Sequence, residues 1–194
     1  MPERPLDTSE GWVLETRRFE RLVLPHLDAA WRLARWLTRN EADAEDLVQE
    51  AYVRAWRFFS SLRGDDAKPW LMRIVRNCWY SRARTEAGRG RATSLEDAEA
   101  EVEAVLQAQA EPDGAEHRLI RIEDTALVRR AMDGLPDEFR EVLVLREVED
   151  MAYRDLAETV GVPIGTVMSR LSRARKLLGE RVRRLSEEAG HGSR

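Results

Sequence analysis

"MAYRDLAETVGVPIGTVMSRLSRARKLL", residues 151–178, contains two short helical patterns separated by a break. The first pattern has a small apolar face, formed by Leu156, Ala157 and Val160. We expect Gly161 to end this helix, because the residue after the last helical turn often needs a positive φ, which glycine adopts freely. Pro163 favours the start of a second helix, because its fixed φ suits the first helical turn. The stretch therefore predicts two helices joined by a short turn.

The second pattern has two unlike sides. At about 100° per residue, one side holds the apolar residues Val167, Leu171, Ala174 and Leu178, and the opposite side holds Thr166, Ser169, Arg170, Arg173 and Lys176. Two helices joined by a short glycine-containing turn form a helix-turn-helix, whose second helix enters the DNA major groove. Arginine there reads guanine, while lysine or serine holds phosphates. The alternative interpretation is a surface helix whose basic residues are merely solvated.

The composition favours an all-α protein without a cofactor. The chain is 43% hydrophobic and 35% charged, and no stretch shows the alternation of half-buried strands. Its single cysteine cannot form an internal disulfide, and neither CxxC nor HExxH occurs, so we expect no metal site. No paired carboxylates, nucleophile with a base, or phosphate-binding loop indicates an enzyme. No apolar stretch approaches the roughly 18 residues that span a bilayer, so we expect no membrane insertion and a cytoplasmic location.

The distribution of charge indicates where the chain divides. Residues 86–124 carry 4 basic and 11 acidic residues, a net charge of −7, whereas the segments before and after are slightly positive. This acidic segment begins glycine-rich and is broken by Pro112-Asp113-Gly114, which is typical of a turn. We predict a flexible N-terminus (1–14), a first small helical domain (15–85), a flexible acidic linker (86–124), a second helical domain (125–185) and a flexible tail (186–194).

A further helix is predicted over about residues 44–59, with Asp43 as its N-cap. Its apolar side contains Leu47, Val48, Ala51, Tyr52, Ala55, Phe58 and Phe59, and its other side contains Asp46, Gln49, Glu50 and Arg57. An acidic and polar side of this kind suits a basic protein surface. Ordinary solvation explains it equally well.

The segment "KPWLMRIVRNCWYSRAR", residues 68–84, predicts the next helix. Its buried side contains Trp70, Leu71, Ile74, Val75 and Cys78, and its opposite side contains Arg73, Arg76, Asn77, Tyr80 and Arg84. Single-stranded nucleic acid requires such a mixture, because cations follow the phosphates and aromatic rings stack on unpaired bases. We therefore predict a nucleic-acid-binding side on this helix.

Taken together, "DAEDLVQEAYVRAW", "PWLMRIVRN", the acidic linker and the helix-turn-helix resemble an extracytoplasmic-function sigma factor of bacterial RNA polymerase over about residues 17–184. The resemblance implies that the first domain binds core polymerase and the minus-10 promoter element, and that the second reads the minus-35 element. It implies core-polymerase contacts at Asp46, Leu47, Gln49 and Glu50. It implies minus-10 contacts and strand opening at Arg63, Arg73, Arg76, Asn77, Tyr80 and Arg84, with Arg63 in a loop (60–68) that receives a flipped-out base. Minus-35 contacts are implied at Thr166, Ser169, Arg170, Arg173 and Lys176.

The partners implied by the resemblance are the beta-prime and beta subunits of core RNA polymerase, promoter DNA and an anti-sigma factor, with no small-molecule substrate. Two other functions compete with this prediction. A stand-alone helix-turn-helix regulator would need a dimerisation surface or a ligand pocket, and the sequence suggests neither. A sigma-like decoy for an anti-sigma protein would lack the basic side of residues 166–176, which this chain has.

Overall fold

The computed structural model describes residues 8–87 and 125–191. The first part contains α1 (Thr8–Val23), a 3₁₀ turn η1 (Leu24–His26), α2 (Leu27–Thr38), α3 (Glu41–Arg57), a 3₁₀ turn η2 (Phe59–Ser61) and α4 (Ala67–Ala87). The second part contains α6 (Thr125–Asp133), α7 (Asp137–Leu143), a π-helical turn η3 (Val144–Val148), α8 (Tyr153–Val160) and α9 (Ile164–His191). These two ranges contain no strand, so the all-α prediction is confirmed.

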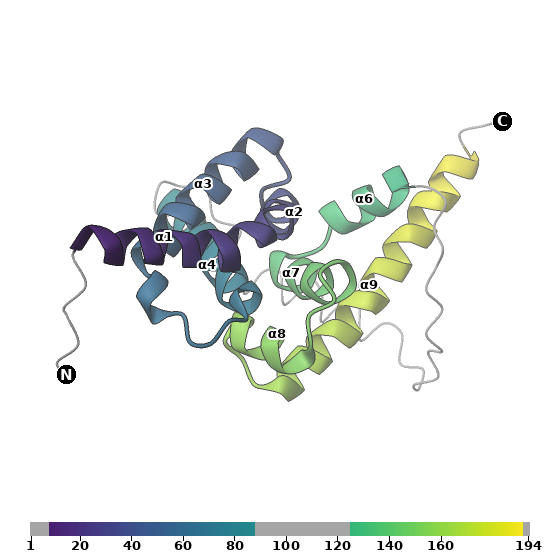
Figure 1. The fold of residues 1–194 in the computed structure, drawn as a ribbon. Helices are drawn as coiled ribbons and strands as arrows, with labels where there is room; N and C mark the ends of the chain where they lie inside the picture. The colour runs from purple at the N-terminus through teal and green to yellow at the C-terminus, as the bar shows by residue number, and fades with distance from the viewer. Residues whose placement is uncertain (1–7, 88–124, 192–194) are drawn as a thin grey trace.

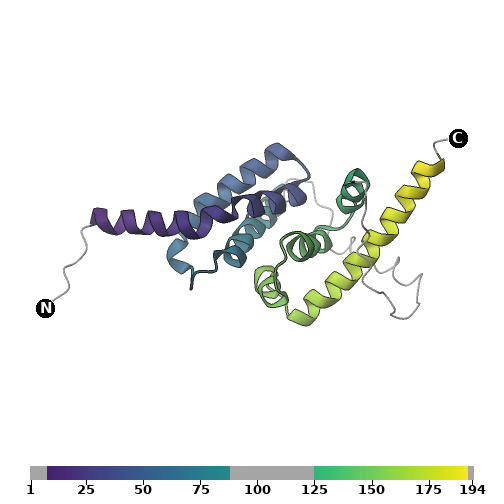
Figure 2. The ribbon, with the colours of Figure 1, turned by 45° about the vertical axis from the view of Figure 1, so that its right-hand side comes forward.

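The two parts are two groups of helices that lie side by side, as predicted for two helical domains (Figure 1). In the first domain α2, α3 and α4 contact one another, and α1 runs out past the end of this bundle. In the second domain α6, α7 and α8 all contact the long helix α9. The domains meet where α4 contacts α8 and where α2 contacts α7 and η3. The second view again shows the two groups of helices side by side (Figure 2).

Helix α3 begins three residues before the predicted start, and its cap differs from the prediction. The side-chain oxygen of Asn40 accepts a hydrogen bond of 3.1 Å from the backbone N–H of Asp43. Asn40 is therefore the N-cap, and the prediction that Asp43 fills this role is wrong. Before it, Arg39 adopts a left-handed conformation (φ 59°) that ends α2. Asparagine and aspartate are about equally favourable N-caps, so a cap at Asn40 is as favourable as the predicted cap at Asp43.

Two predicted flexible segments contain helix. α1 begins at Thr8, inside the segment 1–14, and its buried residues Phe19 and Val23 lie in its second half. α9 extends to His191, inside the segment 186–194, as a direct continuation of a helix that packs against α6. Residues 88–124, which include most of the predicted acidic linker, lie outside the described residues.

The helix-turn-helix is present where it was predicted. α8 ends at Gly161, which has φ 77° and donates its N–H to the Ala157 carbonyl at 2.9 Å. The carbonyl of Pro163 accepts the first backbone hydrogen bonds of α9, from Thr166 at 2.9 Å and from Val167 at 3.1 Å. The glycine and the proline thus perform the roles predicted for them.

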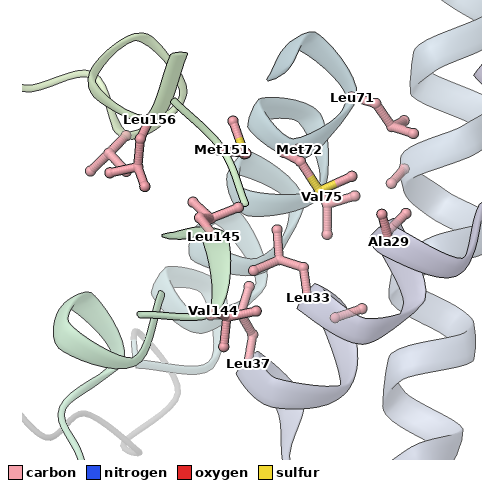
Figure 3. Packing of buried hydrophobic residues seen from close by; sticks show 14 of the residues in the cluster. Ala29, Leu33, Leu37, Leu71, Met72, Val75, Val144, Leu145, Met151 and Leu156 are labelled. Carbon is pink, nitrogen blue, oxygen red and sulfur yellow. The ribbon is translucent and has the colours of Figure 1, made fainter. Parts of the chain in front are cut away.

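The hydrophobic core continues from one domain into the other. Leu33 and Leu37 of α2 and Val75 of α4 lie opposite Val144 and Leu145 of η3 (Figure 3). All five are at most 1% exposed. Burial of apolar surface stabilises by about 25 cal/mol per Å², so the second domain rests on a genuinely apolar part of the first.

Candidate nucleic-acid interface

The exposed side of α9 begins directly after the helix-turn-helix turn. Val167, Leu171 and Ala174 are fully buried, whereas Ser169, Arg173 and Lys176 are exposed and Thr166 is half-buried. The predicted two-sided pattern of this helix is therefore correct. The Ser169 hydroxyl donates to the Thr166 carbonyl at 2.9 Å. Arg173 has no hydrogen bond or ion pair with the described part of the chain, so its guanidinium is free to meet DNA.

Arg170 differs from the other predicted DNA contacts on α9. Its Nη2 lies 3.2 Å from Oε2 of Glu138 in α7, and the two side chains are only 24% and 12% exposed. Arg170 was predicted to lie on the open side of α9 with Arg173, but in the structure it is half-buried at the edge of that side. Its position at the edge of the buried side allows a neighbouring helix to supply a carboxylate. Arg170 holds α9 against α7 in this structure.

The basic face of α4 is the polar side formed by Arg73, Arg76, Asn77, Tyr80 and Arg84. Asn77 and Arg84 are exposed, and so is Arg63 in the preceding loop. Arg73, Arg76 and Tyr80 are half-buried because the second domain covers them. The sequence predicted an open face. The structure instead gives its central residues protein partners.

The most enclosed of these partners is Glu141 of α7, whose side chain is 0% exposed. Its Oε1 lies 2.6 Å from Nε of Arg76, as a charge contact in which the N–H is not aligned for a hydrogen bond. Tyr80 donates its hydroxyl to Oε2 at 3.1 Å, and the Arg76 guanidinium carbon lies 4.5 Å from the centre of the Tyr80 ring. Burial raises the pKa of Glu141 to about 7, although Arg76 and Tyr80 act against this shift. Burial and the Glu141 charge also raise the pKa of Tyr80.

A second enclosed carboxylate, Glu149, follows the π-helical turn η3. Arg32 of α2 donates from Nε at 2.6 Å and from Nη2 at 3.1 Å to its two oxygens. Lys68, at the start of α4, lies 3.1 Å from Oε2 and donates to the Glu149 carbonyl at 2.6 Å. Burial by itself would raise the pKa of Glu149. The hydrogen bonds from Arg32 and Lys68 outweigh burial and lower the pKa.

Other polar contacts also join the domains, among them an ion pair of 3.3 Å between Arg39 and Asp137. The guanidinium of Arg73 donates to the Glu158 carbonyl at 2.9 and 3.2 Å. Thr159 donates its hydroxyl to the Pro69 carbonyl at 3.2 Å. Arg140 of α7, which is fully buried, reaches the Trp36 carbonyl at 3.4 Å. The contact between the domains is therefore polar around an apolar centre.

The predicted polymerase-binding side of α3 is also only partly open. Asp46 and Gln49 are exposed. Glu50 is half-buried, because its two oxygens lie 2.6 Å from Arg54 and 2.7 Å from Arg82 of α4. Leu47 is 0% exposed and lies in the hydrophobic core. Assigning Leu47 to a docking surface is therefore wrong for this structure, because its position on α3 points between the helices of its own domain.

Comparisons with known proteins agree with this arrangement. Residues 22–89 match the family model for sigma-70 region 2, and residues 125–178 match the model for sigma-70 region 4. The RNA polymerase sigma-H factor of Pseudomonas aeruginosa is 32% identical over 90% of this chain and 91% of its own length. This chain belongs to the extracytoplasmic-function sigma factors of the sigma-70 family.

Two further proteins support the membership of this sigma factor in the family. The ECF RNA polymerase sigma factor SigE of Mycolicibacterium smegmatis is 32% identical over 90% of this chain, which spans 65% of the relative's length. The sigma factor RpoE of Bartonella quintana, solved in complex with the anti-sigma factor NepR, has a TM-score of 0.63 and 31% identity. That likeness covers 85% of this chain and 96% of the solved one. Within residues 8–87 and 125–191, no helix of the sigma factor is long and apolar enough to cross a membrane.

Sequence reasoning missed Glu141 and Glu149 as residues that hold region 2 and region 4 together. A signal for Glu141 was present, because it lies beside Val142 in the apolar run "VLVL" of residues 142–145. A carboxylate inside such a run must find a cationic or hydrogen-bonding partner when it is buried. The sequence could not indicate that the partner is Arg76, 65 positions earlier in the numbering.

Proposed function

We propose that this sigma factor directs core RNA polymerase to a set of promoters and assists promoter opening, without catalysing a reaction itself. The observation that carries the proposal is the exposed side of α9, where Ser169, Arg173 and Lys176 stand over a fully packed apolar side in a helix-turn-helix. A region 2 domain with a second basic helix lies in the same chain. Activity on RNA polymerase places the protein in the cytoplasm.

In this proposal the exposed side of α9 reads the minus-35 element. Arg173, whose guanidinium is exposed, makes the bidentate contact with guanine O6 and N7, which is worth about 1 to 3 kcal/mol of discrimination against other bases. Ser169, Thr166 and Lys176 bind phosphates or neighbouring base edges. Arg170 contributes by holding α9 against α7 through Glu138, and it reaches DNA only if that ion pair opens.

The basic face of α4 and the loop that contains Arg63 bind the opened minus-10 element. Arg73, Arg76 and Arg84 follow the phosphates, while Asn77 offers hydrogen bonds to a base edge. Tyr80 gives an aromatic surface for stacking, which is worth about 1 to 3 kcal/mol per base. Captured bases offset the few kcal/mol that unstacking costs.

Core polymerase binds the polar side of α3 through Asp46 and Gln49, with Glu50 at its edge. These residues are acidic or polar and two of them are exposed, which suits a basic surface on the beta-prime subunit, while beta contacts other parts of the chain. An anti-sigma factor is the expected negative regulator, because the similar Bartonella quintana protein was solved with one.

Transcription in vitro with purified components tests the proposal. Core polymerase with this protein should start transcription at a distinct set of sites in a genomic promoter library, and core polymerase alone should not. Arg173→Glu should remove minus-35-dependent initiation while polymerase binding by gel filtration is retained. Failure to initiate on any fragment, by a preparation that does bind core polymerase, would refute the promoter-directing role.

A further inference from the structure

Two exposed apolar side chains lie at the start of α9, and the proposed function does not use them. Ile164 is 49% exposed and Met168 is 57% exposed. Within residues 125–191, the other large apolar residue that is exposed to this degree is Val148. Ile164 and Met168 are four positions apart, so they are neighbours on successive turns of the helix. A single exposed apolar residue is ordinary, but these two form a pair on the helix that is proposed to read DNA.

The packing of region 4 does not use this apolar pair. Val167, Leu171 and Ala174, on the other side of the same turns, are fully buried and hold α9 in its domain. Neither Ile164 nor Met168 belongs to the hydrophobic core of the described residues. Both views place the start of α9 at the lower edge of the molecule (Figure 1, Figure 2). The pair is therefore accessible to an external ligand.

Met168 lies on the same side of α9 as the residues assigned to DNA binding. At about 100° per residue, Met168 and Arg173 flank this side. The exposed residues between them are Ser169, Ser172 and Lys176. In a helix-turn-helix, the N-terminal residues of the second helix contact base edges in the major groove. Since α9 begins at Ile164, Met168 belongs to the part of the helix that reaches the bases.

Gly165 indicates that a ligand approaches the helix closely at this point. A Cβ added to Gly165 would meet no atom of the described residues within 4 Å, and its φ is not positive. Neither packing nor backbone conformation therefore requires a glycine, although glycine weakens a helix relative to alanine. The absence of a side chain instead lets the first turn of α9 approach the base edges closely.

The chemistry of the major groove identifies the ligand of the apolar pair. Guanine, adenine and cytosine present hydrogen-bond donors and acceptors there, whereas thymine also presents its C5 methyl group. A thioether cannot donate a hydrogen bond, and its sulfur is only a weak acceptor. Covering a methyl group is favourable for Met168, because apolar surface of both partners is removed from water. The unbranched, flexible side chain of methionine can adapt to the position of that group.

We propose that Met168, supported by Ile164 one turn earlier, is a specificity-determining residue that contacts the C5 methyl group of a thymine in the minus-35 element. This inference rests on the proposed role of α9 in minus-35 binding. It gives α9 two kinds of readout, because Arg173 reads a guanine by hydrogen bonds and Met168 reads a thymine by apolar contact.

The spacing of the two residues predicts the spacing of the two bases. Met168 and Arg173 are five positions apart, which is about 7.5 Å along a helix that rises about 1.5 Å per residue. Successive bases of one DNA strand are about 3.4 Å apart along the duplex. The thymine should therefore lie about two or three base pairs from the guanine that Arg173 contacts.

Deoxyuridine tests the contact, because it pairs like thymidine and lacks only the C5 methyl group. The probe is a fluorescein-labelled promoter duplex obtained from the genomic library, with the thymines of its minus-35 element replaced one at a time on both strands. Fluorescence anisotropy measures the affinity of the holoenzyme for each duplex. We expect one thymine whose replacement weakens binding by the wild type about fourfold, as the loss of one buried methyl group predicts. Guanines replaced by 7-deazaguanine, which lacks N7, locate the base that Arg173 contacts.

Met168→Gln is the variant that tests the residue. It keeps the length of the side chain and removes its apolar character, so the same thymine should then be replaced by deoxyuridine without loss of affinity. The matched control is Val148→Gln, which changes another exposed apolar residue of region 4 outside α9. This control should keep the sensitivity of the wild type. Circular dichroism checks that both variants remain helical, and the scan with the wild type depends on no variant.

The outcomes separate this inference from the proposed function. If binding depends on Arg173 but no thymine responds to loss of its methyl group, the inference is overturned and the proposed function stands. A thymine response that is unchanged in Met168→Gln also overturns the inference, because another residue then reads the methyl group. So does a lower affinity of Met168→Gln for core polymerase with the thymine response unchanged, since the pair is then a protein contact. Absence of specific binding by the wild-type holoenzyme to every promoter duplex would refute the proposed function, and this inference with it.

Discussion

Leu47 tests whether a residue on α3 acts in the core or at the surface. It is 0% exposed, so Leu47→Ala should lower the free energy of unfolding by about 2 to 5 kcal/mol through lost burial and a cavity. Gln49→Ala, two positions away and exposed, should change it by less than about 0.5 kcal/mol. Urea unfolding followed by circular dichroism measures both. Equal stabilities for the two variants would contradict the core assignment.

Arg170 and Arg173 are both arginines on α9 but have different surroundings. Arg173→Ala should weaken binding to minus-35 duplex DNA in the holoenzyme about tenfold or more and leave the melting temperature unchanged, because it removes only a base contact. Arg170→Ala should lower stability by about 1 kcal/mol, because Glu138 loses its partner in a half-buried place. A double-mutant cycle with Glu138→Ala isolates the ion pair. Additive losses would show that the pair contributes nothing.

Which residues the sequence could place follows from the range of the forces involved. Val167, Leu171 and Ala174 were assigned correctly to the buried side of α9 because a helix repeats its own faces. Arg76 and Tyr80 were expected to be open, and they are half-buried because their partner comes from α7. Helical periodicity tells which way a side chain points. It does not indicate which residue of another domain will contact that side chain.

At the scale of elements, Gly161 determines where α8 stops. Its φ of 77° is unfavourable for any residue with a Cβ, although nothing lies within 4 Å of the place where one would be built. Gly161→Ala should therefore destabilise the second domain by about 1 to 2 kcal/mol through backbone strain alone. Gly179→Ala, inside α9 and equally uncrowded, should have the opposite sign, about 0.5 to 1 kcal/mol stabilising. Thermal melts distinguish the two, and two destabilising results would contradict the strain explanation.

The helices themselves were largely predictable, because their signals are local. α3, α4, α8 and α9 were each expected from apolar spacing, and the boundary between α8 and α9 also from Gly161 and Pro163. The errors occurred at the ends: Asn40 caps α3, α1 begins at Thr8 and α9 runs to His191. Caps compete over a few residues with similar free energies, and a helix continues wherever packing supports one more turn. Neither decision leaves a strong mark in the sequence.

At the scale of the whole molecule, the contact between the domains was beyond sequence reasoning. Arg32 and Glu149 are 117 positions apart, and Tyr80 and Glu141 are 61 apart. No periodicity connects residues across such separations. What the composition did show is that region 2 and region 4 can each present basic residues, and the structure adds that region 4 also carries the carboxylates that neutralise region 2.

The packing of region 4 on region 2, the closed form of the molecule, should depend on pH through Glu141, with a sign set by the raised pKa of its carboxyl. The closed form keeps Glu141 protonated up to about pH 7, whereas in an open form the carboxyl should return towards its ordinary value of 4.5. The closed form thus binds more protons in this window, so raising the pH from about 4.5 to about 7 should weaken closure, by at most about tenfold per pH unit for one group. Arg76, Tyr80 and Arg170 face Glu141 and limit the effect.

His26 titrates beside the same contact, since burial and Lys68 of region 2 lower its pKa below 6.5 while Glu149 of region 4 acts to raise it. Glu141→Gln keeps this side chain neutral at every pH, so it distinguishes the effect of Glu141 from that of His26. Spin labels at the exposed positions Ala42→Cys and Ser186→Cys report the distance between the domains by double electron–electron resonance. The wild type should show a growing open fraction between about pH 5 and pH 8, and Glu141→Gln should lack the part of this increase that Glu141 causes. Since His26 is present in both proteins, the difference between their pH profiles belongs to Glu141, and identical profiles would mean that its carboxyl does not control separation of the domains.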